Sequence, residues 1–182
     1  MSRHTVLTAV GRDRPGLVEE VSEFLLERGG SIEESRMANL LGQFAIVMLV
    51  TGTDDAVAAI VGDADVLAET VGIDARFAPV EPDAAPAAPT HRLVVHALDQ
   101  PGLVHEVADV LRRFDVNIET LETALESAPI TGTPVFAMTI VVAVPSGVSI
   151  AEVEQELARV CDPLNITWEL APLAAAALGA SR

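Results

Sequence analysis

The strongest constraint on the fold of this chain is an internal repeat. Residues 13–18, which read DRPGLV, recur as residues 99–104, which read DQPGLV. The flanking positions keep the same ungapped register, and the matched pairs are Leu7 with Leu93, Glu20 with Glu106, Val21 with Val107, Leu25 with Leu111, Ile32 with Ile118 and Glu33 with Glu119. So long a match indicates two copies of one structural unit.

A segment rich in proline and alanine separates the copies. Pro82, Pro86 and Pro89 favour extended backbone there and exclude a regular helix or a central strand. We therefore assign residues 1–80 to a first domain, 81–90 to a linker, 91–172 to a second domain and 173–182 to a C-terminal tail.

Each copy has the pattern strand, helix, strand, strand, helix, strand. The strands are expected at residues 6–10, 31–41, 44–50 and 73–78 of the first copy, and at 93–98, 118–125, 135–144 and 165–170 of the second. The inward helical positions are expected to be Leu17, Val21, Phe24, Leu25, Val57, Ile60, Val61 and Ala64, then Leu103, Val107, Val110, Leu111, Phe114, Ile150, Val153, Leu157 and Val160. Gly29 and Gly30 end the first helix. The predicted fold class is α+β, with two ferredoxin-like βαββαβ domains whose antiparallel sheets carry helices on one face.

The third strand of the first copy is apolar on both faces. Phe44, Ile46 and Met48 point one way, while Val47 and Leu49 point the other. Helices cover only one face of such a sheet, and the other face needs a neighbouring sheet or chain. We therefore predict that the copies pair, either within one chain or in a homodimer.

Composition excludes several functions. The 182-residue chain has 27 acidic and 11 basic residues and a net charge of −16, which disfavours direct nucleic-acid binding. Every basic residue is arginine, which excludes lysine-dependent chemistry such as a Schiff base. Cys161 is the single cysteine, so we expect no intrachain disulfide, no cysteine-based zinc site and a cytoplasmic location. No apolar run reaches the roughly 18 residues of a membrane span.

The repeat pattern, with an Asp-x-Pro-Gly turn before the first helix, resembles the ACT domain, a ferredoxin-like module that binds amino acids. Residues 13–18, 31–40 and 44–52 together resemble the glycine cleavage system transcriptional repressor family. The resemblance implies tandem ACT domains that sense glycine and restrain a separate DNA-binding activator by contact. The second copy departs from it at Gln100, which replaces arginine, and at the longer hairpin of residues 127–134. These departures predict unequal binding by the two copies.

The repeated turn is the predicted ligand site. A helix N-terminus offers free N–H groups to an amino-acid carboxylate, and Gly16 and Gly102 allow close approach. The candidate ligand-binding residues are Asp13, Arg14, Gly16, Leu17, Val18, Ser31, Asp99, Gln100, Gly102, Leu103, Val104 and Asn117. In the alternative interpretation the aspartates brace the turn, Pro15 and Pro101 preset the first helical φ, and Ser31, Asn117 and Asn39 are ordinary turn or edge-strand residues.

We predict no catalytic residue, no metal site and no cofactor. His96 and His105 have no ligand spacing around them, although His105 lies one turn from Gly102 and remains a candidate to line the second site. The expected function is a regulator that senses a small amino acid, glycine first, and contacts a transcription regulator. The alternative is a dissociable regulatory subunit of a metabolic enzyme. A catalyst like formyltetrahydrofolate deformylase is disfavoured, because a second regulatory repeat follows the linker.

Overall fold

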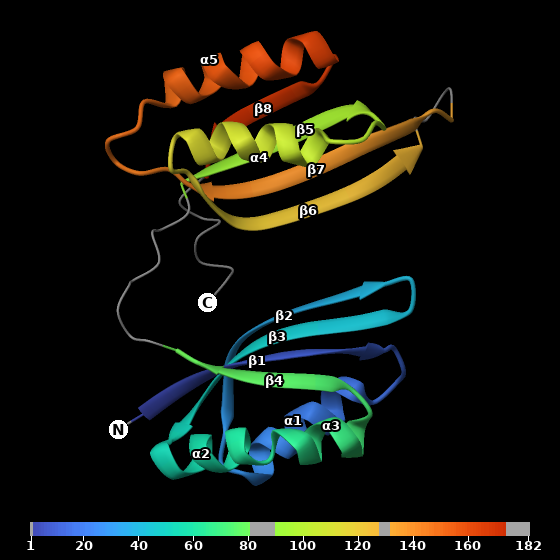
Figure 1. Cartoon of the computed structure of the whole chain (residues 1–182), viewed down its shortest axis with the longest axis vertical. Coiled ribbons are helices and arrows are strands. Elements are labelled where there is room, and N and C mark those ends of the chain that lie inside the picture. The colour runs from blue at the N-terminus through green and yellow to red at the C-terminus, as the bar shows by residue number, and fades with distance from the viewer. Residues whose placement is uncertain (1, 81–89, 128–131, 174–182) are drawn as a thin grey trace. The chain divides into compact units, whose positions relative to one another are not determined.

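The chain forms two compact units, Met1–Ala84 and Ala85–Arg182, each with one sheet and one layer of helices (Figure 1). This computed structural model describes residues 2–80, 90–127 and 132–173. The predicted linker and tail lie almost wholly outside the described residues, as does part of the longer hairpin loop. The domain boundaries therefore stay predictions.

The elements follow the predicted repeat order. In the first unit they are β1 (Ser2–Arg12), α1 (Leu17–Glu27), β2 (Ser31–Leu40), β3 (Gln43–Thr53), α2 (Asp54–Gly62), α3 (Ala64–Val71) and β4 (Asp74–Pro79). In the second unit they are β5 (His91–Leu98), α4 (Leu103–Arg113), β6 (Asn117–Ser127), β7 (Pro134–Ala143), α5 (Ile150–Cys161), the 3₁₀ turn η1 (Asp162–Leu164) and β8 (Thr167–Pro172).

Both sheets have the same topology. The strand order is β2-β3-β1-β4 in the first unit and β6-β7-β5-β8 in the second, with every pairing antiparallel. The helices of each unit lie on one face of its sheet (Figure 1). The edge strands β2 and β6 carry equivalent register shifts, after Ile32 and after Ile118. The predicted α+β, ferredoxin-like fold is confirmed.

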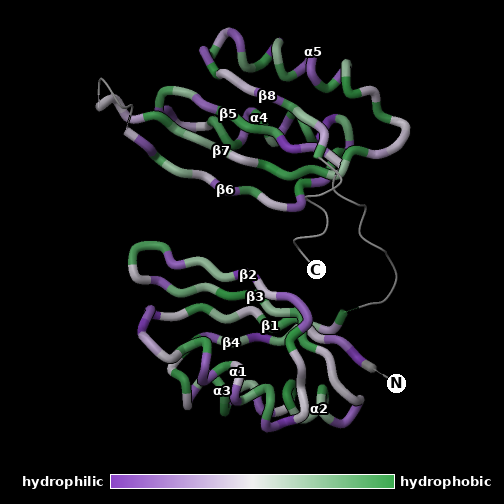
Figure 2. Tube along the Cα trace, turned by 180° about the vertical axis from the view of Figure 1, so that it is seen from behind, coloured by the Kyte–Doolittle hydropathy of each residue, from purple (hydrophilic) through white to green (hydrophobic). Residues whose placement is uncertain are grey.

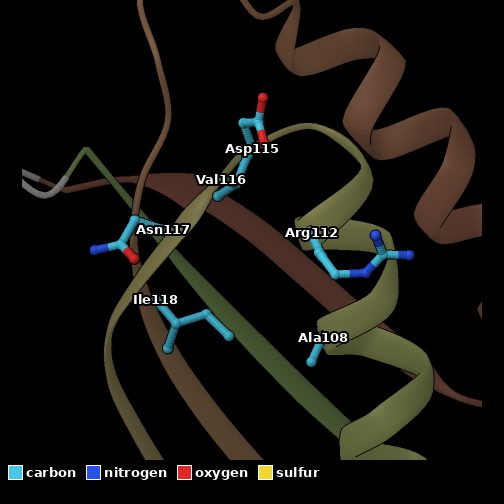
Figure 3. A pocket seen from close by; sticks show the side chains of 6 residues that line it. All are labelled: Ala108, Arg112, Asp115, Val116, Asn117 and Ile118. Atoms are coloured by element: carbon cyan, nitrogen blue, oxygen red, sulfur yellow. The ribbon is translucent and has the colours of Figure 1, made fainter.

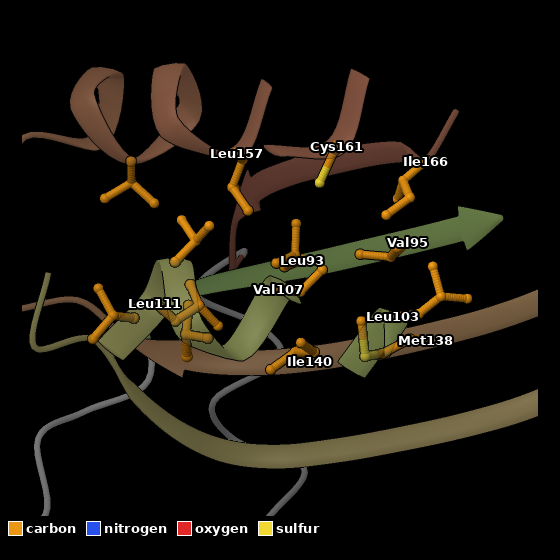
Figure 4. Packing of buried hydrophobic residues seen from close by; sticks show 14 of the residues in the cluster. Leu93, Val95, Leu103, Val107, Leu111, Met138, Ile140, Leu157, Cys161 and Ile166 are labelled. Carbon is orange, nitrogen blue, oxygen red and sulfur yellow. The ribbon is translucent and has the colours of Figure 1, made fainter. Parts of the chain in front are cut away.

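The core of each unit lies between its sheet and its helices. In β3 the side chains of Phe44, Ile46, Met48 and Val50 are at most 4% exposed. In the second unit, Leu157 and Cys161 of α5 pack over β5, together with α4 residues that include Leu111 (Figure 4). Burial of these apolar side chains is the main stabilising term of each unit.

The second helical segment of the first unit differs from the prediction. It is broken at Asp63 into α2 and α3, and Val61, which we expected to face inward, is 43% exposed. Leu67 and Val71 of α3 enter the core instead. Gly62 and Asp63, both weak helix formers, occupy the break.

The hairpin between β2 and β3 turns through Leu41 and Gly42. Their φ angles are 52° and 80°, as in the primed turns that match the twist of a hairpin. Leu41 is fully exposed, and a leucine in the left-handed region is strained. The backbone conformation of this hairpin tip is therefore imposed by the pairing of β2 with β3, and not by the conformational preference of Leu41.

The sheet face opposite the helices is partly apolar in the first unit. Val10 of β1 and Val47 of β3 are each 45% exposed, and β1 and β3 carry long hydrophobic stretches (Figure 2). Among the described residues no helix is long and apolar enough to cross a membrane. Within the same ranges, no group of three or more His, Cys, Asp or Glu side chains could hold a metal ion.

Candidate functional site

The turn between β1 and α1 follows directly from its glycine. Gly16 has a φ of 93° and is the N-cap of α1, which begins at Leu17. Gly102 has a φ of 97° and occupies the same place before α4. Only glycine adopts this conformation without strain. Pro15 therefore precedes the N-cap and does not set the first helical φ, contrary to the alternative interpretation. The Asp13 side chain accepts a hydrogen bond from Asn39.

A groove of about 470 Å³ opens at this turn in the first unit. Its lining includes five of the predicted ligand-binding residues, which are Asp13, Arg14, Gly16, Leu17 and Val18. Glu19 and Ser22 of α1, Met37 of β2 and Phe44 of β3 complete it. The groove thus combines a helix N-terminus, the acidic side chains of Asp13 and Glu19, and apolar side chains.

Asp13 is held from across the hairpin. The Asn39 amide donates to Asp13 Oδ2, and the Gly42 N–H donates to Asn39 Oδ1 at 3.2 Å. The Asp13 N–H donates in turn to the Gly42 carbonyl at 2.8 Å. These bonds fix Asp13 at the mouth of the groove and tie the β2–β3 hairpin to the turn.

Arg14 is held from the helix side. Its guanidinium makes a two-pronged ion pair with Glu20, in which Nη2 donates to Oε2 at 2.6 Å. Nη2 also donates to the Val71 carbonyl at the end of α3, at 3.0 Å. The ion pair lowers the pKa of Glu20 and raises that of Arg14, chiefly through the hydrogen bonds between them. Both groups are charged at neutral pH.

The second turn has the same backbone and different side-chain contacts. Leu103 is 3% exposed, as Leu17 is 2% exposed, so both leucines belong to the cores. Gln100 donates through Nε2 to the Leu164 carbonyl at 3.4 Å, which parallels the contact of Arg14 with Val71. The residue that matches Asn39 is Leu125, which is 62% exposed.

The remaining residues of the second turn add little to a site. Val104 is 37% exposed on α4, and Gly102 has open space around the position of a Cβ. Among the described residues, no hydrogen bond or ion pair joins the Asp99 carboxylate to a neighbour. The second turn therefore carries an unbraced aspartate.

Ser31 and Asn117 lie away from the turns of their own units. They begin β2 and β6, and Ser31 pairs with Thr51 at the far end of β3 from Phe44. Asn117 lines a separate hollow of about 380 Å³ with Ala108, Arg112, Asp115, Val116 and Ile118 (Figure 3). Within one unit, the structure does not bring these two residues to the predicted turn site.

The first-unit groove has the chemistry of a binding site. The first N–H groups of α1 have no partner inside the helix and attract an anion. The Asp13 carboxylate attracts a cation, and the exposed side chains of Val18 and Met37 supply apolar contact. His96 and His105 are exposed on the surface of the second unit.

Sequence reasoning missed Glu20 as the partner of Arg14 and left Asn39 undecided. Asn39 carries a weak signal, because it lies three residues before the turn glycine Gly42 and such an amide can bond that backbone. The sequence gives no signal for Glu20 except that it carries a charge opposite to that of Arg14 in the first turn of the helix. Met37 and Phe44 read only as strand residues.

The family comparison supports the fold of the first unit. The model of the ACT domain matches residues 3–78. The glycine cleavage system transcriptional repressor of Escherichia coli (strain K12) is 26% identical over 165 residues, which cover 89% of this chain and 86% of the relative.

Two solved structures match nearly the whole chain. A protein of unknown role from Galdieria sulphuraria superposes with a TM-score of 0.80 at 28% identity, covering 96% of this chain and 100% of that one. A protein provisionally assigned as a glycine cleavage system transcriptional repressor superposes with a TM-score of 0.71 at 24% identity, covering 95% and 98%, and this likeness concerns the fold alone. The first unit therefore matches the ACT domain, and over most of its length the chain is similar to the glycine cleavage system transcriptional repressor of Escherichia coli.

Proposed function

We propose that this chain is a non-catalytic regulatory protein that senses a small amino acid, glycine first, at the β1–α1 turn of its first unit. The observation that carries the proposal is the groove in which the N-terminus of α1 and the Asp13 carboxylate face the same space. A zwitterion needs both an anion site and a cation site, and this groove offers both.

In this proposal each end of the ligand has its own partner. The ligand carboxylate lies at the N–H groups of the first turn of α1, and its ammonium lies at Asp13, whose Oδ2 is already bonded to Asn39. A small side chain rests on Val18 and Met37. The second turn, with an unbraced Asp99 and a neutral Gln100, binds more weakly.

The proposed output is a protein contact. The relative in Escherichia coli is described as a transcriptional repressor, and a net charge of −16 is unsuited to direct DNA contact. We propose that ligand binding changes the affinity of this chain for a transcription regulator in the cytoplasm. We also propose that its modules pair, within one chain or in a homodimer, which covers apolar sheet faces such as the one around Val47.

A thermal-shift screen of the twenty amino acids, followed by calorimetry, tests the sensing role. Asp13→Asn removes the charge and keeps an oxygen that can accept from Asn39, and Asp99→Asn is the matched control in the second turn. We expect one small amino acid to raise the melting temperature of the wild type and of Asp99→Asn. The same ligand has little effect on Asp13→Asn. The absence of any shift at millimolar concentrations rejects the proposal.

The identity of the partner separates a transcription regulator from the alternative, a metabolic enzyme of which this chain is a dissociable regulatory subunit. Affinity purification of the tagged full chain, with and without the ligand, identifies the bound protein. A DNA-binding protein whose recovery depends on the ligand supports our proposal. A catalytic chain in its place supports the alternative.

A further inference from the structure

The first-unit groove contains a strong carboxylate-binding group that is already engaged. Arg14 lines the groove, and a guanidinium binds a carboxylate better than any other side chain because it donates two parallel hydrogen bonds. In this structure both terminal nitrogens of Arg14 bond the Glu20 carboxylate. The group best suited to hold the carboxylate of a ligand therefore holds one from the protein itself.

The Glu20 carboxylate lies close to the helix N-terminus. A Cβ placed on Gly16 would lie 3.3 Å from Glu20 Oε1, so this oxygen is beside the left-handed glycine that begins α1. The Glu20 N–H also donates to the Gly16 carbonyl at 2.9 Å. Both Arg14 and the α1 terminus attract a carboxylate to this place, and Glu20 occupies it.

We infer that Glu20 is an internal competitor for the carboxylate of the sensed ligand, and that it sets the concentration at which the first unit responds. The inference rests on the proposed sensing role and deepens it. A ligand carboxylate must displace Glu20 from Arg14, so part of its binding free energy is spent on breaking the ion pair. The affinity is thereby held below what the exposed guanidinium would give.

Arg14 stays partly fixed even when a ligand displaces Glu20. The bond from Nη2 to the Val71 carbonyl does not involve Glu20, and it keeps the guanidinium near the groove when the ion pair opens. Side-chain exposures of 43% for Arg14 and 32% for Glu20 leave both groups accessible to a solute. The second unit lacks this device, because the neutral Gln100 offers no ion pair to Glu106.

The test compares Glu20→Gln with Glu23→Gln. Both variants remove one negative charge from α1, and Glu23 is exposed one turn further along, outside the groove lining and the Arg14 ion pair. Calorimetric titration uses glycine and glycinamide, which lacks the carboxylate. We expect Glu20→Gln to bind glycine about fivefold more tightly than wild type, the scale of an exposed ion pair. Its affinity for glycinamide stays unchanged, and Glu23→Gln resembles the wild type for both ligands.

Several outcomes overturn the inference. Equal or weaker glycine binding by Glu20→Gln means that Glu20 positions Arg14 and does not compete. An equal gain in Glu23→Gln means that only the total charge matters. A gain for glycinamide as large as that for glycine points to a general loosening of the turn.

An additional variant and probe separate this inference from the sensing role. In the background of Arg14→Gln, Glu20→Gln should no longer raise the affinity for glycine, because the guanidinium for which the two carboxylates compete is absent. A rise that persists in this background contradicts the inference. Acetate tests the competition without any amino-acid specificity. If no amino acid binds but acetate binds Glu20→Gln more tightly than wild type, the sensing role fails and the competition stands; if acetate shows no difference either, both fail.

Discussion

In the first unit the β1–α1 turn is braced by Asn39 and carries the Arg14–Glu20 ion pair, whereas the matching turn of the second unit has neither. The two turns begin from nearly the same six residues. Both have a left-handed glycine, a buried leucine and a side-chain donor to a carbonyl near the last helix. The difference shows that the hexapeptide specifies the backbone, while residues outside it specify the binding chemistry.

The shared part of the turns should give the largest effects. Leu17→Ala and Leu103→Ala each remove a side chain that is at most 3% exposed, and we expect a loss of about 2–5 kcal/mol in the free energy of unfolding of the affected unit. Urea unfolding followed by Trp168 fluorescence reports on the second unit, because the chain has one tryptophan. Leu103→Ala should shift this transition and Leu17→Ala should not. A shift of equal size in both variants would show that the units unfold together.

The next largest effect is expected at alkaline pH, where the second unit, which contains Cys161, should lose stability. Burial raises the pKa of the Cys161 thiol to about 11 from an ordinary value of 9.0. A raised pKa in the folded state stabilises the second unit below pH 9, and this stabilisation is lost as the pH rises through about 11. The loss is about 2–3 kcal/mol.

The measurement is the Trp168 unfolding transition between pH 8 and 11.5. The chain contains no lysine or tyrosine, so few other groups titrate in this window. Cys161→Ala is the control, with lower stability at pH 8 and a flatter pH dependence. A wild-type transition that does not move with pH would be incompatible with the buried thiol.

The hairpin tip of the first unit offers a gain in stability. Leu41→Gly relieves a leucine with a φ of 52°, and we expect about 1 kcal/mol of stabilisation. Leu40→Gly is the matched control, since Leu40 is also exposed but lies in β2 and glycine weakens a strand. Circular dichroism melting should rank Leu41→Gly above wild type and Leu40→Gly below it. Destabilisation by Leu41→Gly would mean that this leucine makes a contact, for example with a second copy.

The smallest expected effect tests the brace itself. Asn39→Leu introduces the residue of the second unit and removes the bonds to Asp13 and Gly42, for a loss of about 1 kcal/mol or less. Hydrogen exchange of the Asp13 and Gly42 amides should increase. The reciprocal change, Leu125→Asn, should leave the second unit nearly unaffected, and an equal response in both units would remove the distinction between the turns.

Most of the fold could be predicted from the sequence, because the repeat and the strand and helix periodicities are local signals. The prediction that Val61 faces inward was wrong. The apolar pattern of the sequence contains no sign that the helix breaks at Asp63 or that Leu67 fills the core. The site was predictable only in its backbone. The pairing of Asn39 with Asp13 depends on the register of β2 with β3, and no local pattern encodes it.

The tether from each turn to the last helical segment has a consequence for how the two units are compared. Arg14 donates to the carbonyl of Val71 and Gln100 to that of Leu164, so the position needs a long side chain with an N–H and not a particular charge. A comparison of the two positions by charge alone counts arginine against glutamine as a divergence. The two units thus keep the same tether with different charges, and in our proposal it is this difference that lets the first unit, and not the second, set a threshold for its ligand.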